Sequence, residues 1–217
     1  MASFPVIRFL TTWFVELYFH TRGHGTQNIP ERGPFVVVAN HASFLDPYMI
    51  GYTSLQRQVG FMAKEELFRA PLFGPFIRRC GAFPVKRNSR DMEAVHQFHD
   101  FLNSGKPLVV FVEGTRTLNG ELQPAKKGSG MLLYNAKVPV IPAYIDGTFH
   151  CWPKGKLLPK PGPISVTYGA PVPLDDLYAE KPEKITYAKI ANRVMEHITK
   201  LKPQKNQQNH ASISESN

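Results

Sequence analysis

Short apolar runs, each about the length of one buried strand, recur along this chain of 217 residues and alternate with stretches of helical periodicity. The runs cover residues 35–39, 58–62, 82–85, 108–112, 140–145 and 164–168. Continuous apolar runs of this kind are typical of strands buried on both faces, as in parallel sheets covered by helices. The alternation therefore predicts an α/β fold with a largely parallel central sheet flanked by helices.

The chain shows the organisation of a single domain. Residues 92–102 carry apolar side chains at helical spacing, and residues 185–201 repeat that pattern near the end of the chain. Neither an internal repeat nor an interdomain linker is visible, and the length suits one domain. We predict one domain over residues 25–202 and a disordered polar tail over residues 203–217.

The first 24 residues are predicted to form an amphipathic helix. Arg8 and Glu16 interrupt its apolar run, which is shorter than the roughly 20 residues that a membrane span needs. The helix could pack on its own domain or lie in a membrane interface. Trp13 and Leu17 on its apolar face, together with the basic chain, favour the interface.

The net charge of the chain indicates which classes of partner it can bind. Lys and Arg number 26 against 17 Asp and Glu, which gives a net charge of +9. Such an excess attracts phosphates, whether on nucleic acid, on anionic lipid or on a small substrate. Two cysteines, Cys80 and Cys151, are too few for a disulfide framework and fit a reducing compartment.

The most chemically informative stretch is residues 40–47, Asn-His-Ala-Ser-Phe-Leu-Asp-Pro, directly after the first apolar run. Four residues separate His41 from Asp46, enough chain to turn back and bring the carboxylate to the imidazole. A histidine held in this way can act as a general base near neutral pH. Ser43 offers a rival interpretation as a hydrolase nucleophile, but the Gly-x-Ser-x-Gly turn of such enzymes is missing. We favour His41 as the reactive group.

Charged residues also follow two later apolar runs. Arg87 lies just beyond residues 82–85, and residues 113–116 read Glu-Gly-Thr-Arg after another run. Ligands of open parallel sheets bind outside the carboxyl ends of the strands, so these residues are expected to converge with His41. Arg87 and Arg116 could then grip a phosphate bidentately.

Residues 61–79 mix aromatic and basic side chains and allow two interpretations. They could form a core-packed loop with solvated arginines, or an apolar groove with a basic rim that suits an acyl chain on an anionic head group. Phe68 and Phe73 are the candidate groove residues. Residues 126–128, Lys-Lys-Gly, are interpreted as a solvated basic loop.

In their order along the chain, four blocks resemble the glycerolipid acyltransferase family over residues 25–169. The blocks are Asn40-His41-x4-Asp46, Gly81-x-Phe83-x3-Arg87, Phe111-x-Glu113-Gly114-Thr115-Arg116 and Val140-Ile141-Pro142. The resemblance implies that His41 is the catalytic base and that Asp46 holds it. It also implies a glycerol phosphate site made of Arg87, Glu113, Gly114, Thr115 and Arg116, and an acyl-donor region at Ile141 and Pro142.

Two positions depart from the family pattern. Thr117 stands where serine is common, which keeps a hydroxyl, and Lys86 stands where an acidic residue often precedes the arginine. The extra positive charge of Lys86 beside the expected phosphate site leaves the identity of the acceptor open.

The activity that the resemblance implies is O-acyl transfer in phospholipid synthesis, from a thioester to the sn-2 hydroxyl of 1-acylglycerol 3-phosphate, giving phosphatidic acid without a covalent acyl-enzyme. The implied partners are the lysophospholipid acceptor, acyl-CoA or acyl carrier protein as co-substrate, and a membrane surface, with no cofactor, metal or nucleic acid. The implied location is the cytoplasmic face of a membrane, as a peripheral or monotopic protein. Two alternatives stay open: another acceptor, either glycerol 3-phosphate or a lyso-aminolipid, and a non-catalytic protein that binds anionic lipid.

Overall fold

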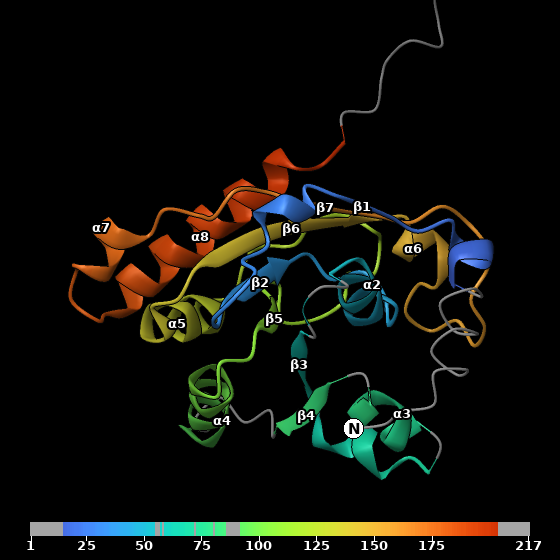
Figure 1. Cartoon of the computed structure of the whole chain (residues 1–217), viewed down its shortest axis with the longest axis horizontal. Helices are drawn as coiled ribbons and strands as arrows, with labels where there is room; N and C mark the ends of the chain where they lie inside the picture. The colour runs from blue at the N-terminus through green and yellow to red at the C-terminus, as the bar shows by residue number, and fades with distance from the viewer. Residues whose placement is uncertain are drawn as a thin grey trace, which may run out of the picture.

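A seven-stranded sheet forms the centre of the computed structural model, which describes residues 15–54, 57, 59–71, 73–79, 81–85 and 92–203. The order across the sheet is β1-β7-β6-β2-β5-β3-β4 (Figure 1). The strands are β1 (Arg22–His24), β2 (Val36–Ala39), β3 (Gly60–Lys64), β4 (Ala82–Val85), β5 (Leu108–Phe111), β6 (Val140–Asp146) and β7 (Ser165–Tyr168). The fold is mixed α/β, as predicted.

Five neighbouring strands, from β6 to β4, run parallel to one another, which confirms the largely parallel sheet. Strand β7 pairs antiparallel with β6, and β1 pairs parallel with β7, so these two strands run the other way. An antiparallel neighbour needs no crossover to the opposite edge of the sheet. The connection from β6 to β7, residues 147–164, therefore stays at the edge where β2, β5 and β6 have their carboxyl ends.

Helices cover both faces of the sheet (Figure 1). The helical elements are η1 (Thr26–Asn28), α2 (Asp46–Thr53), η2 (Glu65–Arg69), α3 (Phe73–Arg79), α4 (Met92–Asn103), α5 (Lys127–Ala136), α6 (Thr148–Cys151), α7 (Asp175–Tyr178) and α8 (Lys184–Lys200). Helices α5 and α8 pack closely because α5 has a glycine at the crossing. A Cβ on Gly130 would overlap the carbonyl group of Tyr187 in α8.

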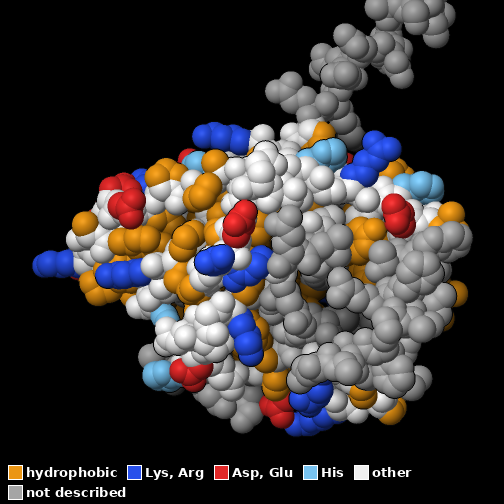
Figure 2. Space-filling model, viewed as in Figure 1, with side chains coloured by type: hydrophobic (Ala, Val, Ile, Leu, Met, Phe, Trp, Pro, Cys, Tyr) orange, Lys and Arg blue, Asp and Glu red, His pale blue; other side chains and the backbone are white. Residues whose placement is uncertain are grey.

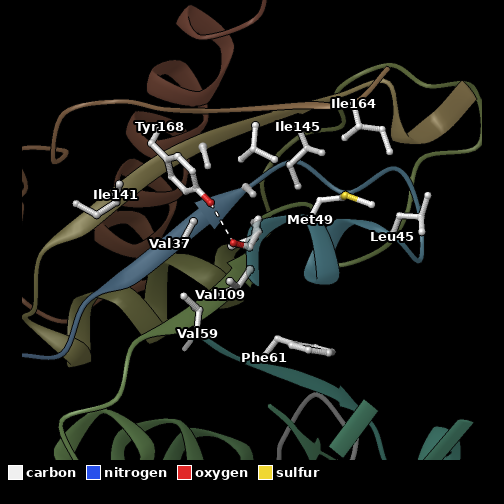
Figure 3. Packing of buried hydrophobic residues seen from close by; sticks show 14 of the residues in the cluster. Val37, Leu45, Met49, Val59, Phe61, Val109, Ile141, Ile145, Ile164 and Tyr168 are labelled. Atoms are coloured by element: carbon white, nitrogen blue, oxygen red, sulfur yellow. Dashed lines mark hydrogen bonds between the residues drawn. The ribbon is translucent and has the colours of Figure 1, made fainter. Parts of the chain in front are cut away.

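The two faces of β2 explain why its sequence is apolar without alternation. Val36 and Val38 belong to the core shared with α8, whereas Val37 belongs to the core on the α2 side, and all three are fully buried. Figure 3 shows the α2 side, where Val37 and Ile141 of the sheet and Met49 of α2 share one apolar cluster with Tyr168. Each such side chain contributes about 1.5–3 kcal/mol by leaving water.

The one polar atom that Tyr168 brings into this cluster is satisfied. Its hydroxyl lies 2.8 Å from the Thr53 hydroxyl and donates to the Ile50 carbonyl at 3.2 Å. Burial raises the pKa of this hydroxyl, so it stays protonated and keeps donating. The bond ties β7 to the end of α2 and so fixes the helix that begins at Asp46.

The N-terminal prediction is only partly covered by the described residues. Residues 15–19 are helical, but residues 22–24 form β1 and join the sheet instead of continuing a helix. Residues 1–14 and 204–217 lie outside the described part, so the interface helix and the disordered tail stay predictions. Within the described residues, no helix combines the length and the apolarity that a membrane span requires.

Figure 2 shows basic side chains interleaved with hydrophobic ones over one face, rather than gathered in a single stripe.

Candidate active site

His41 and Asp46 meet in the turn that leads from β2 into α2. His41 Nδ1 lies 2.8 Å from Asp46 Oδ2, and Asp46 is fully buried. The same carboxylate oxygen accepts hydrogen bonds from the backbone N–H groups of Ala42 at 2.6 Å and Ser43 at 2.8 Å. Because Nδ1 donates to the carboxylate, the Nε2 lone pair is left to accept a proton. The predicted pairing is therefore present.

The end of β5 and the segment that follows it hold His41 from a second direction. The ring stacks on Phe111, the last residue of β5, with centroids 4.0 Å apart and planes 17° apart. The His41 backbone N–H donates to Glu113 Oε1 at 3.3 Å, and the Thr117 N–H donates to the His41 carbonyl at 2.9 Å. The His41 turn and the turn at residues 113–116 thus form one hydrogen-bonded unit.

Asn40, which the sequence places in the motif without a separate role, fixes this unit to β6. Its side-chain amide donates to the Ile145 carbonyl at 2.9 Å and accepts from the Ile145 N–H at 2.8 Å. Both partners are buried. A contact between residues 105 positions apart leaves no local signal that sequence reasoning could use.

Ser43 has a structural role in the His41 turn instead of the role of a nucleophile. Its side chain is fully buried, and the hydroxyl donates to the Trp152 carbonyl at 2.7 Å. The same oxygen accepts from the Leu45 N–H at 3.1 Å. These contacts hold the turn against the segment after α6, and they give the covalent alternative no support.

Glu113 points inward and is only 1% exposed. Besides the His41 N–H, it accepts a hydrogen bond on Oε2 from the Gln123 side chain at 3.0 Å, and Gln123 also donates to the Thr115 carbonyl at 3.2 Å. Burial raises the pKa of Glu113 from 4.5 to about 7, although the bonds from His41 and Gln123 act against the rise. Gln123 is a positioning residue that no motif indicated.

This pKa predicts a dependence of stability on pH. The unfolded Glu113 ionises near pH 4.5 and the folded one near 7, so the native state holds the extra proton between those values and loses stability as pH rises through them. The Glu113→Gln variant lacks this pH-dependent contribution to stability. Between about pH 4.5 and 7, the melting temperature of the wild type should therefore fall relative to that of the variant. Above about pH 7, the melting temperatures of the two proteins should change with pH in parallel. Curves that stay parallel throughout would contradict the buried, protonated carboxyl group.

Arg116 is ordered by an aromatic residue from the His41 turn. Its guanidinium carbon lies 3.5 Å from the centroid of the Phe44 ring, and Phe44 is 41% exposed. A guanidinium stacked in this way uses its face, while its N–H donors lie in the plane and are not used by the contact. Phe44 is a second residue that sequence reasoning did not assign to the site. Gly114 at φ 70° makes the turn, and Gly114 and Thr115 are both exposed.

The remaining predicted site residues differ in their burial and in how much of each the structure describes. Arg87 lies outside the described residues, and of Phe73 only its position at the start of α3 is described. Phe68, in η2, is buried, with the Arg78 guanidinium 4.7 Å from its ring centroid. Ile141 and Pro142 are buried in β6, where they pair with Val37 and Val38 of β2.

Two further expectations concern basic and metal-binding groups. The predicted loop at residues 126–128 is wrong in part, because Lys127 is the first residue of α5, although both lysines are exposed. Gly128 and Gly130 lie in the first turn of α5, where glycine lowers helix propensity. Across the described residues, no cluster of His, Cys, Asp and Glu could hold a metal ion.

Comparison with known proteins gives one consistent family. A 1-acyl-sn-glycerol-3-phosphate acyltransferase of Bacillus subtilis is 29% identical over 178 residues, covering 82% of this chain and 86% of the relative. One of Streptococcus pneumoniae is 29% identical over 180 residues, and the chain spans 64% of its length. The crystal structure of the 1-acyl-sn-glycerophosphate acyltransferase of Thermotoga maritima superposes with a TM-score of 0.66 at 26% identity, covering 94% of this chain and 85% of that one. The sequence model of the Acyltransferase family matches residues 20–146, more than half of the 217 residues, so the chain belongs to that family.

Proposed function

We propose that the protein is a 1-acyl-sn-glycerol-3-phosphate acyltransferase, which moves a fatty acyl group from a thioester to the sn-2 hydroxyl of its acceptor and forms phosphatidic acid. The observation that carries the proposal is the 2.8 Å contact between His41 Nδ1 and the buried Asp46 carboxylate. The names of the relatives in Bacillus, Streptococcus and Thermotoga support this choice of reaction.

In the proposed reaction, His41 Nε2 takes the proton of the acceptor hydroxyl while that oxygen attacks the thioester carbonyl carbon. The C–S bond then breaks, the acyl group stays on the acceptor oxygen, and the imidazolium returns its proton to the departing thiolate. Asp46 stabilises the imidazolium between these steps. A positioned base contributes about 10²- to 10⁴-fold to the rate. Holding the two substrates in register can contribute about 7–11 kcal/mol.

Arg116 is proposed to bind the phosphate of the acceptor. Its stacking on Phe44 orders the guanidinium before the ligand arrives, which reduces the entropy that binding must overcome. Glu113 and Gln123 hold the turn that carries Arg116 in the hydrogen-bonded unit around His41. Arg87, after β4, is proposed to add a second guanidinium, and Ile141, Pro142, Phe68 and Phe73 to shape the acyl region.

Arg116→Ala tests the acceptor site. Loss of one charge-assisted contact to phosphate, about 1.5–3 kcal/mol, should raise the KM for lysophosphatidic acid about tenfold to a hundredfold. The KM for the acyl thioester should stay within about twofold, because the donor does not use this contact. Arg193→Ala is the matched control, since Arg193 is paired with Asp176 near the protein surface and should leave both constants unchanged. An unchanged KM for the acceptor in Arg116→Ala would remove Arg116 from the phosphate site.

The choice of substrates can be decided with the purified protein and mass spectrometry of the lipids formed. Acyl-CoA and acyl carrier protein are offered in turn as donors, with 1-acylglycerol 3-phosphate, glycerol 3-phosphate or a lyso-aminolipid as acceptor. Phosphatidic acid from the first acceptor is expected to dominate. Preference for either of the other two would assign a different acyltransferase activity. Binding of lipid without any product would favour a non-catalytic protein.

A further inference from the structure

The loop between α6 and β7 exposes apolar and basic side chains together. Residues 152–163 read Trp-Pro-Lys-Gly-Lys-Leu-Leu-Pro-Lys-Pro-Gly-Pro. Leu157 is 88% exposed and Leu158 75% exposed, and the three lysines of the loop, Lys154, Lys156 and Lys160, are exposed as well. The loop has no acidic residue, and in the described part of the chain none of its lysines forms an ion pair.

We propose that residues 152–163, here called the leucine loop, dock the enzyme on an anionic membrane surface. Adjacent leucines can enter the boundary between head groups and acyl chains, while the flanking lysines meet lipid phosphates. A protein partner fits this surface less well, because two leucines offer far less area than the roughly 1,200 Å² of a stable protein interface. Positive charges that no acidic residue of the loop offsets, next to exposed leucine side chains, are complementary to the surface of an anionic membrane.

The leucine loop is built as a closed, braced turn. The Lys160 N–H donates to the Cys151 carbonyl at 2.7 Å and closes its base. Inside it, the Trp152 indole N–H donates to the Lys156 carbonyl at 2.8 Å, and Gly155 takes a φ of 91° that a side chain would resist. Leucines presented on such a frame can insert without first ordering their backbone.

The base of the leucine loop is joined to the candidate active site. The Trp152 carbonyl accepts the hydrogen bond from Ser43 in the His41 turn, and the Trp152 ring lies 5.9 Å from the ring of Phe44, on which Arg116 stacks. The loop leaves the sheet from the carboxyl end of β6, at the edge where β2 delivers His41. Docking through this loop would therefore bring the active site to the lipid surface.

The other side of the leucine loop is joined to the N-terminal helical residues. The Tyr18 hydroxyl donates to the Pro159 carbonyl at 3.1 Å, and the Gly162 N–H donates to the Tyr18 carbonyl at 3.3 Å. Leu17, next to Tyr18, is 65% exposed. Figure 1 shows this helical end beside the connection that follows α6. The loop thus lies directly beside the described helical residues 15–19, whose Leu17 is a further exposed apolar side chain.

Co-sedimentation of the full chain with vesicles tests the leucine loop without requiring turnover. Vesicles of phosphatidylcholine alone are compared with vesicles that also contain phosphatidylglycerol. Leu157→Ser with Leu158→Ser should weaken partition to the anionic vesicles about tenfold, whereas Ile185→Ser, an exposed apolar site on α8, should change it less than about twofold. Equal binding by the loop variant and the control would overturn the proposal.

The lysines are tested by the same assay with charge-matched variants. The triple variant Lys154→Gln, Lys156→Gln, Lys160→Gln should partition to anionic vesicles about tenfold more weakly and show a weaker dependence on salt. The control variant Lys181→Gln, Lys184→Gln, Lys200→Gln removes the same charge in and next to α8 and should change partition much less. Equal losses of partition in the two sets of variants would mean that only the net charge of the protein matters, and would overturn the proposed docking site.

Two readouts separate this proposal from the proposed reaction. Turnover of a short-chain lysophospholipid dispersed as monomers should be the same in the loop variants as in the wild type, because the active site is intact. In a Trp13→Phe background, Trp152 at the base of the loop gives the same signal in every variant. Above that signal, Leu157→Trp should gain quenching by brominated lipids, and Ile185→Trp should not. Absence of that gain would contradict insertion of the leucine loop even if acyl transfer is confirmed.

Discussion

His41→Gln is expected to lower the kcat of acyl transfer by about 10²- to 10⁴-fold, the contribution of a positioned general base. Glutamine fits the space of the ring but offers no atom that takes up a proton near neutral pH. The fold should survive, because His41 lies at the rim of the core, with 14% of its side chain exposed, and its structural bonds to Glu113 and Thr117 come from its backbone.

Thiol release from an acyl thioester in the presence of lysophosphatidic acid measures this loss, and thermal unfolding followed by circular dichroism checks the fold. His150→Gln is the matched control, since His150 is an exposed histidine in α6. We expect it to retain the kcat of the wild type. A His41→Gln enzyme whose kcat stays within about tenfold of the wild type would remove His41 as the base.

The sheet was largely predictable because its central strands are buried on both faces. Runs such as 108–112 and 140–145 carry that burial directly in their composition, and both form strands. Strand β1 was missed because Arg22–His24 is exposed along its whole length and joins the sheet through its backbone alone. Helix α5 was missed because Gly130 lowers helix propensity, while the reason for that glycine is the close approach of α8.

The candidate site was predictable where the chemistry is local and not where it depends on tertiary contacts. His41 and Asp46 are five positions apart, so the spacing alone indicated the turn. Their meeting with residues 113–116 was expected from the rule that ligands of parallel sheets bind at the carboxyl ends of the strands. That β2 and β5 are direct neighbours is visible only in the register of the sheet. The contact of Phe44 with Arg116 depends on how separate segments approach each other in three dimensions. The same holds for the hydrogen bond from Gln123 to Glu113. No pattern of residue types marks such an approach.

Asp46→Asn is expected to cause the second large loss. One oxygen of Asp46 accepts three hydrogen bonds, from His41 Nδ1 and from the backbone N–H groups of Ala42 and Ser43. An asparagine oxygen can keep these bonds and so preserve the turn, but it carries no charge to stabilise the imidazolium. We expect kcat to fall by about 10²-fold or more, with a modest change in melting temperature. Asp175→Asn, which also changes the first residue of a helix, should leave kcat intact.

Combining the two substitutions distinguishes a carboxylate that acts through the histidine from one that acts on its own. If Asp46 works only by orienting His41 and stabilising its protonated form, then Asp46→Asn should cost almost nothing once His41→Gln is present. The kcat of the double variant should then lie within about threefold of that of His41→Gln alone. Losses that multiply would contradict this dependence and would give Asp46 a separate contact with the substrates. The complete burial of Asp46 argues against such a contact, since none of its carboxylate is exposed to a substrate and one of its oxygens contacts the imidazole.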